Sequence, residues 1–272
     1  MEIFRKLTSM FSGKKPVPEH QPENDYGPLP SLGEIESLLY PLARNATAIK
    51  LKDASRLHPD SAIRSQFGGN PYFEQGMTWP VSDNRLPLDF VFQVFANENT
   101  ELPKDIKLIQ FFYSQEELPN DTDDTGWLVK IFRELNIDKQ VVLPRPEGLE
   151  DTPYCDVVLE SALSLPDWEG INEYLPEITD TLERLNADEP WELYEQICEK
   201  ITGSCYYQTQ LGGYPRWVQG ESTPVNSRGE RVPLLFQVDS EDNAGLMWGD
   251  VGLVYIFYDE TDDKVWFEFQ CH

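Results

Sequence analysis

The strongest constraint in this sequence is a segment that occurs twice. QFGGNPYFEQG at residues 66–76 reappears as QLGGYPRWVQG at residues 210–220, and the alignment runs without a gap to Phe-Gln-Val at residues 92–94 and 236–238. After one residue of slippage, an aromatic stretch at 109–113 lies over one at 254–258, and an acidic turn and a tryptophan follow each. Repeated similarity of this kind indicates duplication of a structural unit. We predict two repeats, at about residues 46–145 and 150–272.

Each repeat opens with a Gly-Gly-x-Pro turn, formed by Gly68, Gly69 and Pro71 in the first and by Gly212, Gly213 and Pro215 in the second. Glycine reaches positive φ angles and proline fixes the direction in which the chain leaves. The pairs lack a following Lys-Ser/Thr and a helix, so they are not phosphate-binding loops.

A near-continuous apolar run follows each turn, at residues 90–95 and 234–238. Such runs predict strands buried on both faces. Gln93 and Gln237 lie inside them. We expect each amide to bond to the backbone of the turn or to its counterpart in the other repeat, because an unpaired buried amide costs about 1–3 kcal/mol.

Helical spacing occurs outside these strands, at residues 31–42, 171–185 and 191–201. Ser31 and Glu34 form a capping-box pattern, and Pro41 should kink or end that helix. Asp188 is a candidate cap and Gly203 a candidate stop for the last helix. The predicted fold class is therefore α+β: an internally duplicated, mainly antiparallel β core with a few peripheral helices, forming one domain over residues 31–272.

The chain is strongly acidic, with a formal net charge of −26 and a pI of about 4.3. This charge opposes binding to nucleic acid and to anionic lipid, and it attracts cations and basic proteins. Solubility alone is an equally valid reading of the acidity.

Residues 1–30 differ from the rest of the sequence. Residues 1–15 have the pattern of a short basic amphipathic helix, which would contact a membrane surface, pack on the body or form a loose tail. A polar, proline-rich linker follows. The sequence shows no secretory signal and no bilayer-spanning run, and its cysteines lack C-x-x-C spacing. We therefore expect a cytoplasmic protein with free thiols.

Metal and cofactor sites are not expected. The chain has 3 histidines, and none forms a His-x-x-x-His pair. The acidic stretch at 121–126 lacks the spacing of a calcium loop and is interpreted as a solvated hairpin turn. Cys271 and His272 are adjacent, but adjacency in sequence is not the geometry of a nucleophile pair.

A candidate cleft arises if the two Gly-Gly turns converge across a pseudo-twofold axis. It would include the turn residues, the two strand glutamines, and Trp79, Trp217 and Trp248. The alternative is that these tryptophans fill the core. Asp89 and Asp250 are its candidate acid or base, or ordinary turn-capping residues. The second repeat has Thr223 where the first has Trp79, so a pocket lined by this tryptophan would exist in one half only.

The paired turns, residues 77–80 (MTWP), the Phe-Gln-Val strands and residues 248–250 (WGD) resemble the YwqG-like family of bacterial domains of unknown function. The resemblance extends from about residue 45 to residue 272. It implies a duplicated, β-rich α+β fold in a bacterial cytoplasmic protein and assigns no reaction. Similar proteins encoded near secreted-toxin loci imply an immunity or accessory role.

Two functions remain open on the sequence alone. The first is a non-catalytic protein-binding module, such as an immunity protein whose acidic face neutralises a basic toxin. The second is an enzyme or small-ligand binder that uses the cleft between the repeats.

Overall fold

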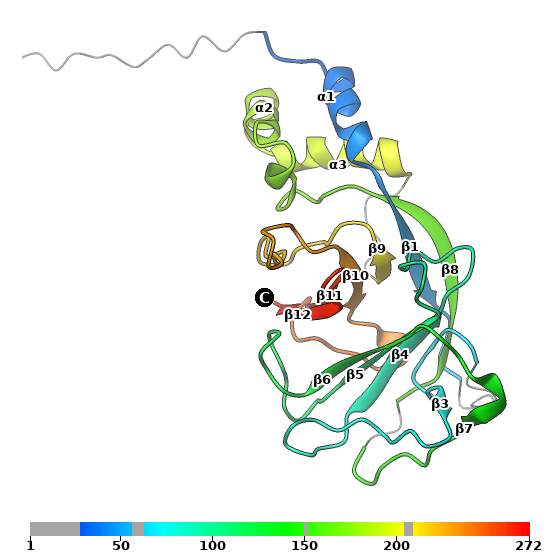
Figure 1. Ribbon diagram of the computed structural model, residues 1–272. Helices are drawn as coiled ribbons and strands as arrows, with labels where there is room; N and C mark the ends of the chain where they lie inside the picture. Colours follow the sequence, from blue (N-terminus) through cyan, green and yellow to red (C-terminus); the bar gives the residue numbers. More distant parts are fainter. Residues whose placement is uncertain (1–27, 56–62, 150–151, 204–208) are drawn as a thin grey trace, which may run out of the picture.

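The computed structural model of the protein describes residues 28–55, 63–149, 152–203 and 209–272 (Figure 1). The amphipathic segment predicted at residues 1–15 lies outside the described residues, as do Cys205 and most of the predicted linker.

Ten strands form one antiparallel sheet whose order is symmetrical about a central pair, β1 and β8. From edge to edge the strands are β12 (Lys264–Gln270), β11 (Leu253–Asp259), β10 (Leu234–Asp239), β9 (Gln210–Gly212), β1 (Arg44–Leu51), β8 (Cys155–Ser164), β2 (Gln66–Phe67), β4 (Asp89–Phe95), β5 (Leu108–Tyr113) and β6 (Trp127–Phe132). A separate pair is formed by β3 (Phe73–Glu74) and β7 (Gln140–Val141). The prediction of a mainly antiparallel β core is confirmed. Below, β2 and β4–β6 are called the first half and β9–β12 the second half.

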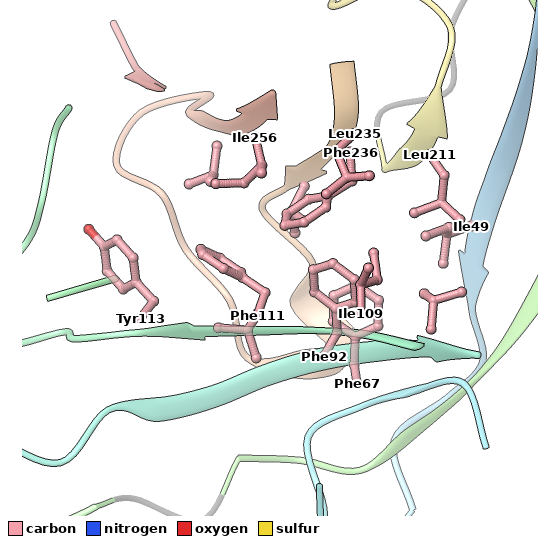
Figure 2. Packing of buried hydrophobic residues seen from close by; sticks show 14 of the residues in the cluster. Ile49, Phe67, Phe92, Ile109, Phe111, Tyr113, Leu211, Leu235, Phe236 and Ile256 are labelled. Atoms are coloured by element: carbon pink, nitrogen blue, oxygen red, sulfur yellow. The ribbon is translucent and has the colours of Figure 1, made fainter. Parts of the chain in front are cut away.

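The sheet curls until its two halves face each other and form a nearly closed, barrel-like structure (Figure 1). Phe92 of β4 meets Phe236 of β10 edge to face, with ring centroids 4.9 Å apart, and Phe111 of β5 packs on the same ring at 5.5 Å (Figure 2). Where the outer edges meet, the Thr122 hydroxyl accepts a hydrogen bond of 2.8 Å from the Phe267 N–H. The two halves therefore share one hydrophobic core, and each covers the aromatic face of the other.

Three α-helices pack at one end of the sheet around a separate apolar cluster that includes Ile35, Leu182 and Ile197 (Figure 1). They are α1 (Leu32–Leu39), α2 (Ile178–Leu185) and α3 (Pro190–Thr202). Four short 3₁₀ turns are η1 (Tyr40–Leu42), η2 (Ile137–Lys139), η3 (Ile171–Glu173) and η4 (Asp242–Ala244). None of the helices in the described ranges is long and apolar enough to cross a membrane.

The helix ends test the predicted signals directly. The capping box before α1 is confirmed, because the Ser31 N–H donates to Glu34 Oε2 at 2.8 Å and the Glu34 N–H donates to Ser31 Oγ at 3.4 Å. Gly203 ends α3 with a φ of 76°, as predicted.

Two helix predictions need correction. Asp188 does not cap α3: the N-cap residue is Glu189, which makes no side-chain cap hydrogen bond, and the helix begins at Pro190. Proline there has no N–H to be capped and its φ suits the helix. The helical pattern at 171–185 is also divided, into η3 and the shorter α2.

Candidate functional site

Buried glutamines hold the two Gly-Gly turns in the same way. Gln66 Nε2 donates to the Gly68 carbonyl oxygen at 2.7 Å, and Gln210 Nε2 donates to the Gly212 carbonyl oxygen at 2.9 Å. Each amide thus takes the place of a backbone donor inside a tight turn. The same glutamine-to-backbone bond therefore holds both turns.

The strand glutamines fix the chain after each turn. Gln93 Oε1 accepts a hydrogen bond of 2.8 Å from the Tyr72 N–H, and Gln237 Oε1 accepts one of 2.9 Å from the Arg216 N–H. The predicted bond between strand amide and turn backbone is confirmed in both halves. Gln93 and Gln237 are fully buried and have a structural role.

The two Gly-Gly turns do not line a common cleft. A Cβ atom on Gly68 would meet Pro153, immediately before β8, whereas one on Gly213 would meet Ser164, the last residue of β8. The turns therefore lie at opposite ends of this strand. The cause is the antiparallel β1–β8 pair at the centre of the sheet, which directs the two halves in opposite directions.

The three tryptophans belong to three separate apolar clusters. Trp248 is 2% exposed and meets the Tyr113 ring at 4.9 Å. Trp217 lies 4.9 Å from the Tyr255 ring, and Trp79 is half-buried against Phe73 in the first half. These contacts favour core filling over a shared binding surface.

The two candidate carboxylates are also separated. Asp89 begins β4 and lines a cleft. Asp250 lies in an exposed turn outside that cleft, and its carbonyl oxygen accepts a hydrogen bond of 2.9 Å from the His272 N–H. An acid–base pair formed by these two residues is therefore not present.

A cleft of about 660 Å³ does lie between the two halves. One wall comes from residues 86–87, 89–91 and 114–116 of the first half, and the opposite wall comes from residues 244–247 of the second. The segment before β8 closes the third side, with Glu147, Gly148, Leu149, Thr152 and Pro153. This is the size range of small-molecule and side-chain binding pockets.

The cleft is acidic. Asp89, Glu116 and Glu147 line it, and its described lining residues include no lysine, arginine or histidine. The Glu116 and Glu147 side chains are exposed, and Asp89 is half-buried. Three carboxylates without a lining cation produce a negative potential that low-dielectric walls focus into the opening.

The rim of the cleft also presents an apolar side chain to solvent. Met247 is 73% exposed, and Val251, four residues further on, is 63% exposed. The backbone of Val251 has a φ of 51°, in the left-handed region that a β-branched residue rarely occupies. The loop is therefore held in a specific, strained shape while it displays Met247 beside the carboxylates.

Cys155, the first residue of β8, is not suited to act as a nucleophile. Cys155 is buried and its Sγ donates to the Asn243 carbonyl oxygen at 3.1 Å. Burial, aided by the negative charge of Glu241, raises the pKa of the Cys155 thiol. The thiol is therefore protonated and unreactive near neutral pH. Among the residues that the structure describes, no group of three or more His, Cys, Asp or Glu side chains is arranged to hold a metal ion.

Sequence reasoning identified Asp89 but missed Glu116, Glu147 and the 244–247 loop. Glu116 lies after β5, Glu147 in the connection before β8, and the loop within the second half. The aligned repeat pattern contains none of them. The only available signal was the general acidity of the chain.

A family model matches residues 65–271 of the chain. Its description is a domain of unknown function, DUF1963. The chain belongs to this family. The DUF1963 match spans both halves from β2 to β12, and α1 and β1 precede it. None of the curated proteins compared with the chain matches it.

Proposed function

We propose that this DUF1963 protein is a non-catalytic protein-binding module that takes a basic segment of another protein into its acidic cleft. The observation that carries the proposal is the set of three cleft carboxylates, Asp89, Glu116 and Glu147, with no cation among the described lining residues. A lysine or arginine side chain would complement their negative charge, and the −26 net charge would accelerate its approach.

The apolar part of the cleft supports a protein segment over a simple cation. Pro87 and Leu149 line the cleft, and exposed Met247 stands at its rim. Methionine is adaptable and common at surfaces that bind other proteins. We therefore expect the bound segment to combine a basic residue with apolar neighbours.

We also propose an evolutionary origin and a cellular location for the protein. The symmetrical strand order and the aligned turns support descent of the two halves from one duplicated unit in a YwqG-like protein. Its acidity and free thiols fit the cytoplasm, where an immunity protein would meet a basic toxin.

The second candidate is a small-ligand binder, favoured by one observation. The cleft is built from both halves and is large enough for a small molecule, with Asp89 on its wall. The Asp89 carboxylate on this wall would favour a small organic cation as the ligand.

The test is affinity capture from native lysate with three full-length baits: the wild type, a cleft variant and a control. The cleft variant is Asp89→Asn, Glu116→Gln, Glu147→Gln. We expect the wild type to retain a stoichiometric basic protein that elutes as salt rises, because screening weakens charge attraction. The cleft variant should retain at least about tenfold less of this basic protein, because its charged hydrogen-bond partners have been removed.

The control bait is Glu183→Gln, Asp188→Asn, Glu192→Gln, which removes the same charge from exposed positions on and beside α2 and α3. It should retain the partner as the wild type does. Equal retention by the cleft variant would place the interface elsewhere. The absence of any basic partner on all baits would reject the protein-binding proposal and leave the small-ligand candidate.

A further inference from the structure

In the first half, Trp79 closes a gap above the sheet. Its ring packs against Phe73 at 5.5 Å and against Phe112 at 6.3 Å, between ring centroids. Its Nε1 donates a hydrogen bond of 2.9 Å to the Leu88 carbonyl oxygen. An indole therefore fills this position and has its polar atom satisfied.

In the second half, Thr223 aligns with Trp79, and the space is not filled. A hollow of about 370 Å³ opens there, lined by Thr223, Val232 and Phe257. Val232 and Phe257 align with Leu88 and Phe112, the neighbours of the indole in the first half. The expectation that a pocket lined by Trp79 would exist in one half only stays a prediction. The hollow described here lies in the half that has threonine at this position.

Larger side chains nearby do not close this hollow. Trp217 aligns with Phe73 and packs in the apolar cluster that also contains Val232, with its ring 4.9 Å from Tyr255 and 6.1 Å from Phe257. It is not among the residues that line the hollow. The Val232 carbonyl oxygen, which aligns with the acceptor used by Trp79, receives no hydrogen bond from the described residues.

The mouth of the hollow carries a cation held between aromatic rings. The Arg44 guanidinium lies 4.1 Å from the centroid of the Tyr214 ring and 5.6 Å from that of Tyr174. The two tyrosine rings meet edge to face at 5.1 Å. Arg44 forms no ion pair within the part of the chain that the structure describes. Its charge is therefore positioned by the rings and available to an anion.

Arg231 forms the adjacent wall, with its charge already neutralised. It pairs with Glu173 at 3.0 Å and with Glu221. Its guanidinium lies 5.7 Å from the centroid of the Tyr174 ring. Arg231 thus supports Tyr174, whereas Arg44 is the group that would select an anion.

We propose that this hollow binds a flat aromatic ligand that carries an anionic group. The ring occupies the place that the Trp79 indole fills in the first half, against Val232 and Phe257, and the anionic group pairs with Arg44. A ring N–H would donate to the Val232 carbonyl oxygen. The site lies apart from the acidic cleft, because the two share no lining residue. It also selects the opposite charge.

Indole-3-acetate is the probe, with indole and acetate as its separate parts, and binding is measured by calorimetry and ligand-observed NMR on the full-length protein. We expect saturable binding of indole-3-acetate, binding of indole at least about tenfold weaker, and none of acetate. Arg44→Gln should weaken binding at least about tenfold, since a charge-assisted contact is lost. Arg184→Gln, an exposed arginine on α2, is the control for net charge and should change nothing.

Thr223→Trp should abolish binding by filling the hollow. Thr223→Val, which keeps the β-branched shape but loses the hydroxyl, should bind within about twofold of the wild type. If Thr223→Trp does not fold, judged by its unfolding curve, Thr223→Leu provides a smaller obstruction and should weaken binding. The proposal is overturned if the wild type shows no saturable binding up to millimolar probe. It is also overturned if Arg44→Gln and the filling variants bind as the wild type does.

Discussion

Replacing Gly68 with alanine tests whether the first Gly-Gly turn is fixed by packing. Gly68 has a φ of 56°, and a Cβ atom built on it would lie 2.2 Å from the Pro153 carbonyl oxygen and 2.9 Å from that of Thr152. Both contacts are with backbone, so no side-chain rotation relieves them. Either the turn or the segment before β8 must move.

The magnitude follows from comparison with Gly76, whose φ is 94° and around which nothing lies within 4 Å. Gly76→Ala introduces only left-handed strain, about 1–2 kcal/mol, partly offset by the lower entropy of the unfolded chain. Gly68→Ala adds the backbone clash. We expect it to lower the free energy of unfolding by at least about 4 kcal/mol, the size of effect that displaced core backbone produces.

The assay is equilibrium unfolding in urea, followed by tryptophan fluorescence and far-UV circular dichroism. A loss of at least about 4 kcal/mol is a large part of the 5–15 kcal/mol typical of a domain, so Gly68→Ala should unfold at much lower urea than Gly76→Ala. If the two variants lie within about 1 kcal/mol of each other, the close approach of the turn to β8 is wrong.

Two further predictions concern buried polar groups. Gln93→Leu leaves the Tyr72 N–H without its acceptor and should cost at least about 1–3 kcal/mol in urea unfolding, whereas Gln75→Leu at an exposed position should cost little. Burial raises the pKa of Asp167 to about 6 from its usual 3.8, so the neutral form is favoured in the folded state. The unfolding free energy of the wild type should therefore rise relative to that of Asp167→Asn as pH falls from about 7 to about 4, by up to about 2 kcal/mol and less if water reaches the half-buried carboxyl. A difference between the two that is independent of pH would contradict this assignment.

Local rules predicted most of the elements. The capping box at Ser31 and the stop at Gly203 require only neighbouring residues, and both are confirmed. The strand glutamines were also predictable, since a buried amide must find a partner and the adjacent turn offers one. The start of α3 was wrong because Pro190 makes a side-chain cap unnecessary there.

The arrangement of the elements was not predictable by the same means. The β1–β8 pair comes from segments that the aligned repeat does not include, and it decides that the Gly-Gly turns lie at opposite ends of the sheet centre. The cleft likewise joins Glu116, Glu147 and Met247, which are far apart in sequence and follow no common spacing. Such sites arise from how the sheet curls. The hydrophobic periodicity of the sequence does not determine how the sheet curls. Packing between the two halves, such as that of Phe92 on Phe236, does.

The difference between Trp79 and Thr223 shows why two aligned halves need not carry the same site. A tryptophan at this position packs its ring and satisfies its N–H, so the first half gains packing there. A threonine gives up that packing, and the Trp217 ring stacks on Tyr255 and Phe257 without lining the open space. An open apolar hollow forgoes packing contacts that a bound ring would supply. An aromatic anion is the ligand that the arrangement of Arg44, Val232 and Phe257 would favour.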